Sequence, residues 1–172
     1  MAVKTSWCLR GACQLKTSQF YIGGKWVAPS SQNTISVINP ATEDCVAEIA
    51  AGTKVDIDRA VAAALAAFPT YSRSSKAERV ELLEAILAAY LKRKDDLAEV
   101  ITQEMGSPLS FSRSAQVWAG EAHLEAHIVA LEAFEFEKPL GRTSVVYEPV
   151  GVCGLITPWN WPMNQVDRKS VV

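Results

Sequence analysis

Apolar and polar residues alternate over the first part of the chain in the way that is typical of β-strands. Residues 20–27 hold an aromatic run, a pair of glycines and a second apolar run, which predicts a hairpin whose glycines take positive φ. Alternation at 34–37 and again at 46–49 predicts two more strands, joined by a turn over 39–44. We therefore expect a half-buried antiparallel platform before any helix begins.

Two helices follow, and each opens on a pair of residues that suits a helix start. Thr53 and Ser75 each precede an acid by three residues, Asp56 and Glu78, and this spacing predicts two capping boxes. The alanine-rich run 57–68 should form the first helix and end at the next residue, a proline. Apolar residues recur at helical spacing after Ser75, so the second helix should be amphipathic.

Two further helices are predicted beyond a basic cluster at 92–94. An acidic pair at 95–96 favours the amino end of the third helix, and Gly106 should end it because glycine accepts the left-handed conformation of a helix terminus. The fourth helix should run over about 110–135. We assign the apolar positions of the second and fourth helices to the core: Val80, Leu83, Leu87, Leu91, Val117, Trp118, Leu124, Ile128 and Leu131.

The last part of the chain combines a strand pattern with a polar and aromatic loop. Residues 143–148 alternate as a strand would, and residues 152–156, apolar but for one glycine, predict a strand buried on both faces. A loop with Pro158 and Pro162 follows, at the position where α/β proteins usually bind ligands. Cys153 lies within the apolar run, where burial disfavours a reactive thiolate, so we expect an inert buried thiol and not a nucleophile.

Four motifs carry a family resemblance. They are Phe-Tyr-Ile-Gly-Gly-Lys-Trp at 20–26, Val-Ile-Asn-Pro-Ala-Thr-Glu at 37–43, Glu-Met-Gly-Ser-Pro at 104–108, and the run 148–162 that ends in Thr-Pro-Trp-Asn-Trp-Pro. In this order and spacing they resemble the aldehyde dehydrogenase superfamily, over about residues 20–165. The resemblance implies an α+β fragment of an α/β parent, with the amino-terminal helices and antiparallel strands of that fold and most of its Rossmann-like sheet missing.

The resemblance also implies a reaction, the oxidation of an aldehyde to a carboxylic acid with NAD or NADP as cofactor. The side-chain amide of Asn160 would be the catalytic donor to the developing oxyanion, although an asparagine between two tryptophans is by itself as often a turn former. Residues matching the dinucleotide pocket are Ile156, Thr157, Pro158 and Trp159, and those matching the aldehyde tunnel are Trp161 and Gln165. The Ile38 carbonyl and Glu104 match positions that can bind a structural monovalent cation.

The resemblance ends after Gln165, and the later elements of the family have no counterpart in the 172 residues. The nucleophilic cysteine, the glutamate base and the glycine turn at the phosphates are missing, and no G-x-G-x-x-G occurs. We expect the amino-terminal part of such an enzyme over 19–165, inactive alone and cut by a frameshift, an alternative transcript or an incomplete gene model, with an unrelated tail at 166–172. Residues 1–18 hold three basic residues and no acid, and we expect a disordered extension or a misassigned start there, in preference to a transit peptide.

Three classes of function stay open. The segment 139–150 resembles an arm that pairs with a neighbouring subunit, so an aldehyde-oxidising homo-oligomer is expected in the full-length form. A non-catalytic fragment that docks onto full-length relatives through the strand near Val145 is the second hypothesis. The third is a zinc-binding helix, because His123 and His127 lie four residues apart, but the H-E-x-x-H pattern is not met and no third ligand is evident. We therefore predict no metal site.

Composition narrows these classes. The chain has 49% hydrophobic and 21% charged residues, a net charge of −2 and a pI near 5.7, so no basic field favours nucleic acid or an acidic membrane. The longest apolar run, 60–68, is too short to span a bilayer. Four cysteines show neither C-x-x-C spacing nor the density of a disulfide scaffold. We expect a soluble, cytoplasmic protein with reduced thiols.

Overall fold

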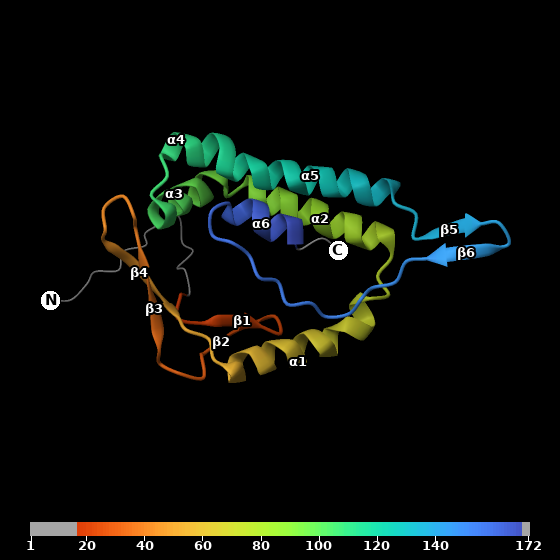
Figure 1. Ribbon diagram of the computed structural model, residues 1–172, viewed down its shortest axis with the longest axis horizontal. Coiled ribbons are helices and arrows are strands. Elements are labelled where there is room, and N and C mark those ends of the chain that lie inside the picture. The colour runs from red at the N-terminus through yellow and green to blue at the C-terminus, as the bar shows by residue number, and fades with distance from the viewer. Residues whose placement is uncertain (1–16, 170–172) are drawn as a thin grey trace.

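A computed structural model of the chain describes residues 17–169. The helices after residue 75 form one layer, the first helix lies apart from it beside the first hairpin, and three separate hairpins complete the arrangement (Figure 1). Nearly all of the expected extension at 1–18 and the last three residues of the expected tail at 166–172 lie outside the described residues. The α+β character expected for the chain is confirmed. Within residues 17–169, none of the helices combines the length and the apolar character needed to cross a membrane.

Each of the three sheets is an antiparallel pair. Strand β1 (Phe20–Ile22) pairs with β2 (Lys25–Val27), and β3 (Thr34–Ile38) pairs with β4 (Cys45–Ala50), so both predicted hairpins are confirmed. The glycines between β1 and β2 have φ of 59° and 77°, as the turn requires. The hairpins remain separate two-stranded sheets, so the single platform expected from the alternation is wrong. The third pair joins β5 (Glu137–Leu140) to β6 (Thr143–Val146), a partner strand that the sequence did not predict.

The two predicted capping boxes are both present. Helix α1 (Lys54–Tyr71) begins after Thr53, and α2 (Lys76–Leu91) begins after Ser75, each with reciprocal hydrogen bonds to the acid three residues on. The predicted end of α1 is wrong, because Pro69 lies inside its last turn. A proline removes one backbone donor, but the turn still closes through the Ser72 amide, which donates to the Phe68 carbonyl at 2.8 Å.

Asp56 does more than cap α1. Its carboxylate accepts from the Ser30 amide at 2.9 Å, from the Ser30 hydroxyl at 2.7 Å and from the Thr53 amide at 3.0 Å. The hydrogen bond from the Ser30 side chain is the main reason why the pKa of Asp56 falls from 3.8 to about 2. Only 5% of Asp56 is exposed. Its polar partners near the surface shield it from solvent, and it does not lie in a deep apolar core. The carboxylate thus ties the segment after β2 to the start of α1.

The predicted fourth helix is one rod with a π-helical turn near its start. Helix α3 (Lys94–Met105) ends at Gly106, whose φ of 68° confirms the predicted left-handed cap. The rod then runs through α4 (Leu109–Phe111), a π-helical turn η1 (Ser112–Gln116) and α5 (Val117–Ala133). The single uninterrupted helix that was expected is therefore wrong in this detail. The π turn adds one residue per turn and rotates the faces of α5 relative to α4.

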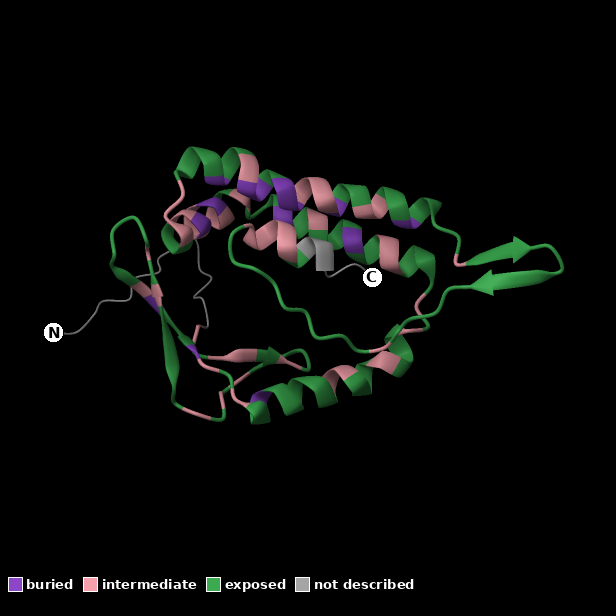
Figure 2. Cartoon of the chain, in the orientation of Figure 1, coloured by how far each residue is buried: buried purple, intermediate pink, exposed green. Residues whose placement is uncertain are grey.

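The core lies among α2, α3 and α5, where the buried positions in Figure 2 face one another. The Tyr90 hydroxyl, also buried there, donates to the Val117 carbonyl at 2.7 Å. The core assignment is wrong for two residues, since Leu91 is 43% exposed and Trp118 is 58% exposed. In each case the preceding residue of the helix is buried instead. The buried cluster is Leu83, Tyr90, Ala98, Ile101, Val117, Leu124 and Leu131.

The apolar run at 152–156 does not form the predicted strand. Residues 147–161 form a long segment without helix or strand that runs from β6 back to α6 (Pro162–Lys169), and nearly all of it is exposed (Figures 1 and 2). A strand buried on both faces requires neighbouring strands to pair with its backbone, and residues 17–169 place none beside it. Cys153 is consequently exposed, so the expectation of a buried thiol is wrong.

Candidate functional site

The segment 147–161 is attached to the helical layer at its carboxyl end. The side-chain amide of Gln116 donates to the backbone carbonyl of Asn160 at 3.2 Å. The rings of Phe111 and Trp161 meet edge to face, with centroids 5.9 Å apart. The Gln165 amide donates to the Trp161 carbonyl at 3.0 Å, which starts the ladder of α6. Two contacts from the α4–η1–α5 rod thus hold the chain where the segment turns into a helix.

Helix α6 is docked on the same rod. The side chain of Met163 packs against the core cluster, and Asn164 Nδ2 lies 3.0 Å from Nε2 of His123 on α5. The predicted aldehyde-side residues Trp161 and Gln165 are half-buried at this junction. Asn160 itself is exposed, so its side-chain amide is accessible to a ligand while its backbone is held. The structure therefore brings three of the seven predicted site residues together at the start of α6.

The four residues predicted to contact a dinucleotide precede this junction on the open segment. Ile156 is 88% exposed and Trp159 is 79% exposed, and Thr157 and Pro158 between them are exposed as well. They offer apolar side chains and backbone groups to solvent, and other residues line the cavities of about 470, 560 and 430 Å³ described for residues 17–169. Large exposed apolar side chains in one continuous segment are typical of a surface that binds something.

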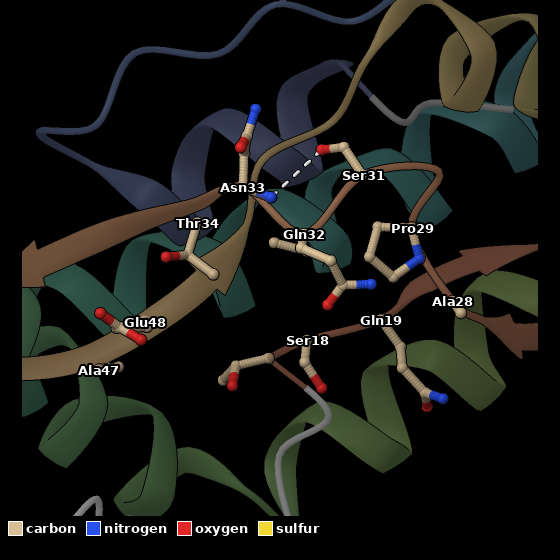
Figure 3. A pocket seen from close by; sticks show the side chains of 12 residues that line it. Ser18, Gln19, Ala28, Pro29, Ser31, Gln32, Asn33, Thr34, Ala47 and Glu48 are labelled. Carbon is tan, nitrogen blue, oxygen red and sulfur yellow. Dashed lines mark hydrogen bonds between the residues drawn. The ribbon is translucent and has the colours of Figure 1, made fainter. Parts of the chain in front are cut away.

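Two cavities lie elsewhere. One of about 470 Å³ lies between the β1–β2 and β3–β4 hairpins, and Figure 3 shows Ser18, Gln32 and Glu48 around it. Among the described residues of its lining, Glu48 is the one titratable side chain, so these residues provide no acid and base pair for catalysis. A second, of about 560 Å³, lies at the start of the open segment and is lined by Ser72, Ser74, Lys76, Arg79, Phe136, Tyr147, Glu148 and Pro149. Neither was predicted from the sequence, and neither contains a predicted site residue.

The two histidines lie side by side on α5. Their rings are 6.3 Å apart and nearly parallel, and burial followed by the neighbouring His123 lowers the pKa of His127. Among residues 17–169, no group of three or more His, Cys, Asp or Glu side chains is arranged to hold a metal ion. One ring nitrogen of His123 is already within hydrogen-bonding distance of Asn164. Both histidines are half-buried, so the solvated helix face that their acidic neighbours Glu121 and Glu125 would predict is not formed at this pair.

Sequence reasoning missed the residues that hold the site. Gln116 and Phe111 both lie in the predicted fourth helix, outside every motif of the resemblance. A signal for Gln116 exists only in hindsight, as a polar residue directly before the buried Val117. Glu104, which matches a family position for a structural monovalent cation, is exposed by area, although the protein around its carboxyl removes enough water to raise its pKa.

Comparison with known proteins gives one consistent family. Residues 26–172 match the model of the aldehyde dehydrogenase family. The chain is 48% identical over 152 residues to a 3-succinoylsemialdehyde-pyridine dehydrogenase of a Pseudomonas species, a match that covers 88% of this chain and 32% of that protein.

Solved structures agree. The chain resembles an aldehyde dehydrogenase of Bartonella henselae with a TM-score of 0.88 and 41% identity, over 90% of this chain and 33% of that one. It resembles aldehyde dehydrogenase C of Pseudomonas syringae, solved as a mutant with NAD+ and octanal, with a TM-score of 0.86 and 43% identity, over 89% of this chain and 32% of that one. The chain spans about a third of the length of these relatives.

Proposed function

Because this chain belongs to the aldehyde dehydrogenase family, we propose that it forms the amino-terminal part of an enzyme that oxidises an aldehyde to a carboxylic acid with NAD or NADP. The observation that carries the proposal is the junction at Asn160, where the backbone is held by Gln116 and the side-chain amide stays accessible. A preorganised amide donor of this kind suits an oxyanion.

The reaction that fits this family begins with attack of a thiolate on the aldehyde carbon, which places negative charge on the carbonyl oxygen. Asn160 donates a hydrogen bond to that oxygen, and such a donor contributes roughly 3 kcal/mol to the transition state. NAD or NADP, when bound, accepts the hydride that leaves the aldehyde carbon. Water then hydrolyses the thioester, which releases the acid and returns the thiolate.

The residues of this chain fit one side of a dinucleotide. Ile156 and Trp159 present exposed apolar surfaces for ring contact, and Thr157 and Pro158 present backbone between them. Trp161 and Gln165 flank Asn160 at the start of α6, where they contact the aldehyde. The nucleophile and the base come from outside these 172 residues, so the 172-residue polypeptide alone does not oxidise aldehydes.

The test uses the longest native polypeptide that contains these residues, enriched from its source with an antibody against the 76–91 helix. Aldehydes of increasing chain length are supplied with NAD or NADP, and reduced nicotinamide is followed by its absorbance. Asn160→Ala should lower kcat by about 10²- to 10³-fold, since one oxyanion donor is lost. Asn33→Ala is the control. Asn33 is also exposed but lies far from Asn160 in the sequence, so this substitution should leave kcat unchanged. Equal kcat values for the two variants, or no oxidation of any aldehyde, would refute the proposal.

A second candidate function rests on the β5–β6 hairpin, which projects from the helical layer with all eight strand residues exposed (Figure 1). Leu140, Val145 and Val146 are large apolar side chains on it, and each strand has one edge unpaired within the described sheet. We propose that this arm, over 139–150, pairs with another subunit in the full-length homo-oligomer or docks this chain onto full-length relatives. Loss of co-purification with a full-length relative in Val145→Lys, but not in Val129→Lys on α5, is the expected result.

The boundaries of these parts are proposals too. We propose residues 19–165 as the amino-terminal part of the enzyme domain, with a separate extension at 1–18, a tail at 166–172 and a cytoplasmic location. The reduced thiols expected from the cysteine pattern support that location. Helix α6 crosses the boundary after Gln165, and limited proteolysis read by mass spectrometry tests whether the chain is cleaved there.

A further inference from the structure

Gln116 is a polar side chain in an unusual place. Only 3% of it is exposed, and it occupies the last position of the π-helical turn. Its Nε2 donates to the Asn160 carbonyl, whereas its Oε1 is buried and has no partner among the described residues. Burying a glutamine amide is unfavourable unless hydrogen bonds within the protein replace those that its oxygen and nitrogen lose with water.

The turn that carries Gln116 is held by its own buried network. The Ser112 hydroxyl, which is fully buried, lies 2.8 Å from Oγ1 of Thr102 and 2.6 Å from Oγ of Ser107. Directly after the turn, the Val117 carbonyl accepts from the Tyr90 hydroxyl. Hydrogen bonds therefore anchor Ser112, which precedes Gln116 in the turn, through its side chain, and the residue after Gln116, through its backbone carbonyl. Such π-helical insertions are rare and occur frequently at functional sites.

We infer that Gln116 is a positioning residue for Asn160, an inference that rests on the proposed function. A hydrogen bond to a backbone carbonyl fixes the peptide plane, and this plane sets the direction in which the Asn160 side chain leaves the backbone. The bond lies at the boundary between the exposed dinucleotide-contacting residues and the docked start of α6. Gln116 thereby determines where the oxyanion donor points without touching the substrate.

Two isosteric substitutions test this role. Gln116→Met keeps the length of the side chain and removes the donor. Gln116→Glu keeps the shape and, in its ionised form at the assay pH, replaces the donor with an acceptor. Gln103→Met is the matched control, since Gln103 is an exposed glutamine on α3. In the longest native polypeptide, kcat per titrated active site should fall about tenfold in both Gln116 variants, with the KM for the dinucleotide changed less than about twofold. A general loss of folding would instead lower the number of titrated sites.

A second readout does not need activity. In the 172-residue chain, the amide ¹⁵N resonance of Trp161 reports on the Asn160 carbonyl, because the two atoms share a peptide bond. This resonance should shift in both Gln116 variants and stay in place in Gln103→Met, while resonances of the core helices are retained in all three. If Gln116→Met fails to fold, the Trp161 resonance of Gln116→Glu tests the positioning role.

The two experiments separate the two ideas. If the wild-type protein oxidises no aldehyde, the proposed function fails, and the Trp161 resonance still shows whether Gln116 sets the backbone at Asn160. If the wild type is active but the Gln116 variants match Gln103→Met in kcat, the positioning role is overturned. An unmoved Trp161 resonance overturns it as well.

Discussion

Gly106→Ala should destabilise this fold strongly, for two reasons that can be measured separately. The residue has φ of 68°, where a side chain is strained. A Cβ there would lie 2.9 Å from the backbone nitrogen of Ala41 and 2.9 Å from Cγ of Pro40. Both neighbours belong to the turn between β3 and β4, and one of them is backbone, so neither can move aside without shifting the hairpin.

The expected magnitude follows from these two terms. A left-handed conformation costs a non-glycine residue about 1–2 kcal/mol, and an added methyl in a closely packed contact costs about 1–3 kcal/mol more. Gly23→Ala is the matched control, since Gly23 has φ of 59° and its Cβ would meet only the Ala63 Cβ, at 3.7 Å. The control therefore carries the strain without the overlap. We expect Gly106→Ala to exceed it by about 1–3 kcal/mol.

Urea unfolding of the 172-residue chain, followed by far-ultraviolet circular dichroism, gives both values from midpoints and slopes. Equal destabilisation by the two substitutions would refute the reasoning, because it would mean that the end of α3 does not press on the turn at 40–41. A changed slope for Gly106→Ala alone would point instead to loss of the hairpin before the helices unfold.

Two further substitutions probe single polar contacts. Since the hydrogen bond from Ser30 lowers the pKa of Asp56 to about 2, its contribution to stability is present above pH 3.8 and is lost as the pH falls toward 2. In Asp56→Asn the urea midpoint should change less over this range than in the wild type. Tyr90→Phe removes the hydrogen bond to the Val117 carbonyl and should cost about 1 kcal/mol, or a Tm decrease of about 2–4 °C, whereas Tyr71→Phe at an exposed site should change the Tm little.

Local chemistry explains which parts of the fold the sequence could predict. The capping boxes at Thr53 and Ser75, the glycine turn of the first hairpin and the cap at Gly106 each depend on residues within four positions of one another. The conformational preferences of those residues decide the outcome, so the pattern is sufficient. The family motifs were similarly sufficient to place Asn160 in the loop after the apolar run, whereas helix α6 directly after it was not predicted.

Long-range contacts explain the rest. The π-helical turn depends on Ser112 meeting Thr102 and Ser107, and no spacing rule encodes a widened turn of this kind. The run at 152–156 has the composition of a buried strand, but strand formation requires partners that residues 17–169 do not provide. Gln116 was missed for the same reason, because its partner Asn160 is 44 positions away.

The position of the site relative to the core has a mechanical consequence. Asn160 lies where the exposed segment meets α6, and α6 is fixed to the buried cluster through Met163. Complete burial of a methionine side chain contributes about 1.5–3 kcal/mol, and the partly buried Met163 contributes a fraction of that to the docking of α6. The start of α6 and the Asn160 backbone therefore share the stability of the α2–α3–α5 core. The exposed residues from Ile156 to Trp159 do not share it, and under the proposed function a bound dinucleotide would order them against the fixed Asn160 backbone.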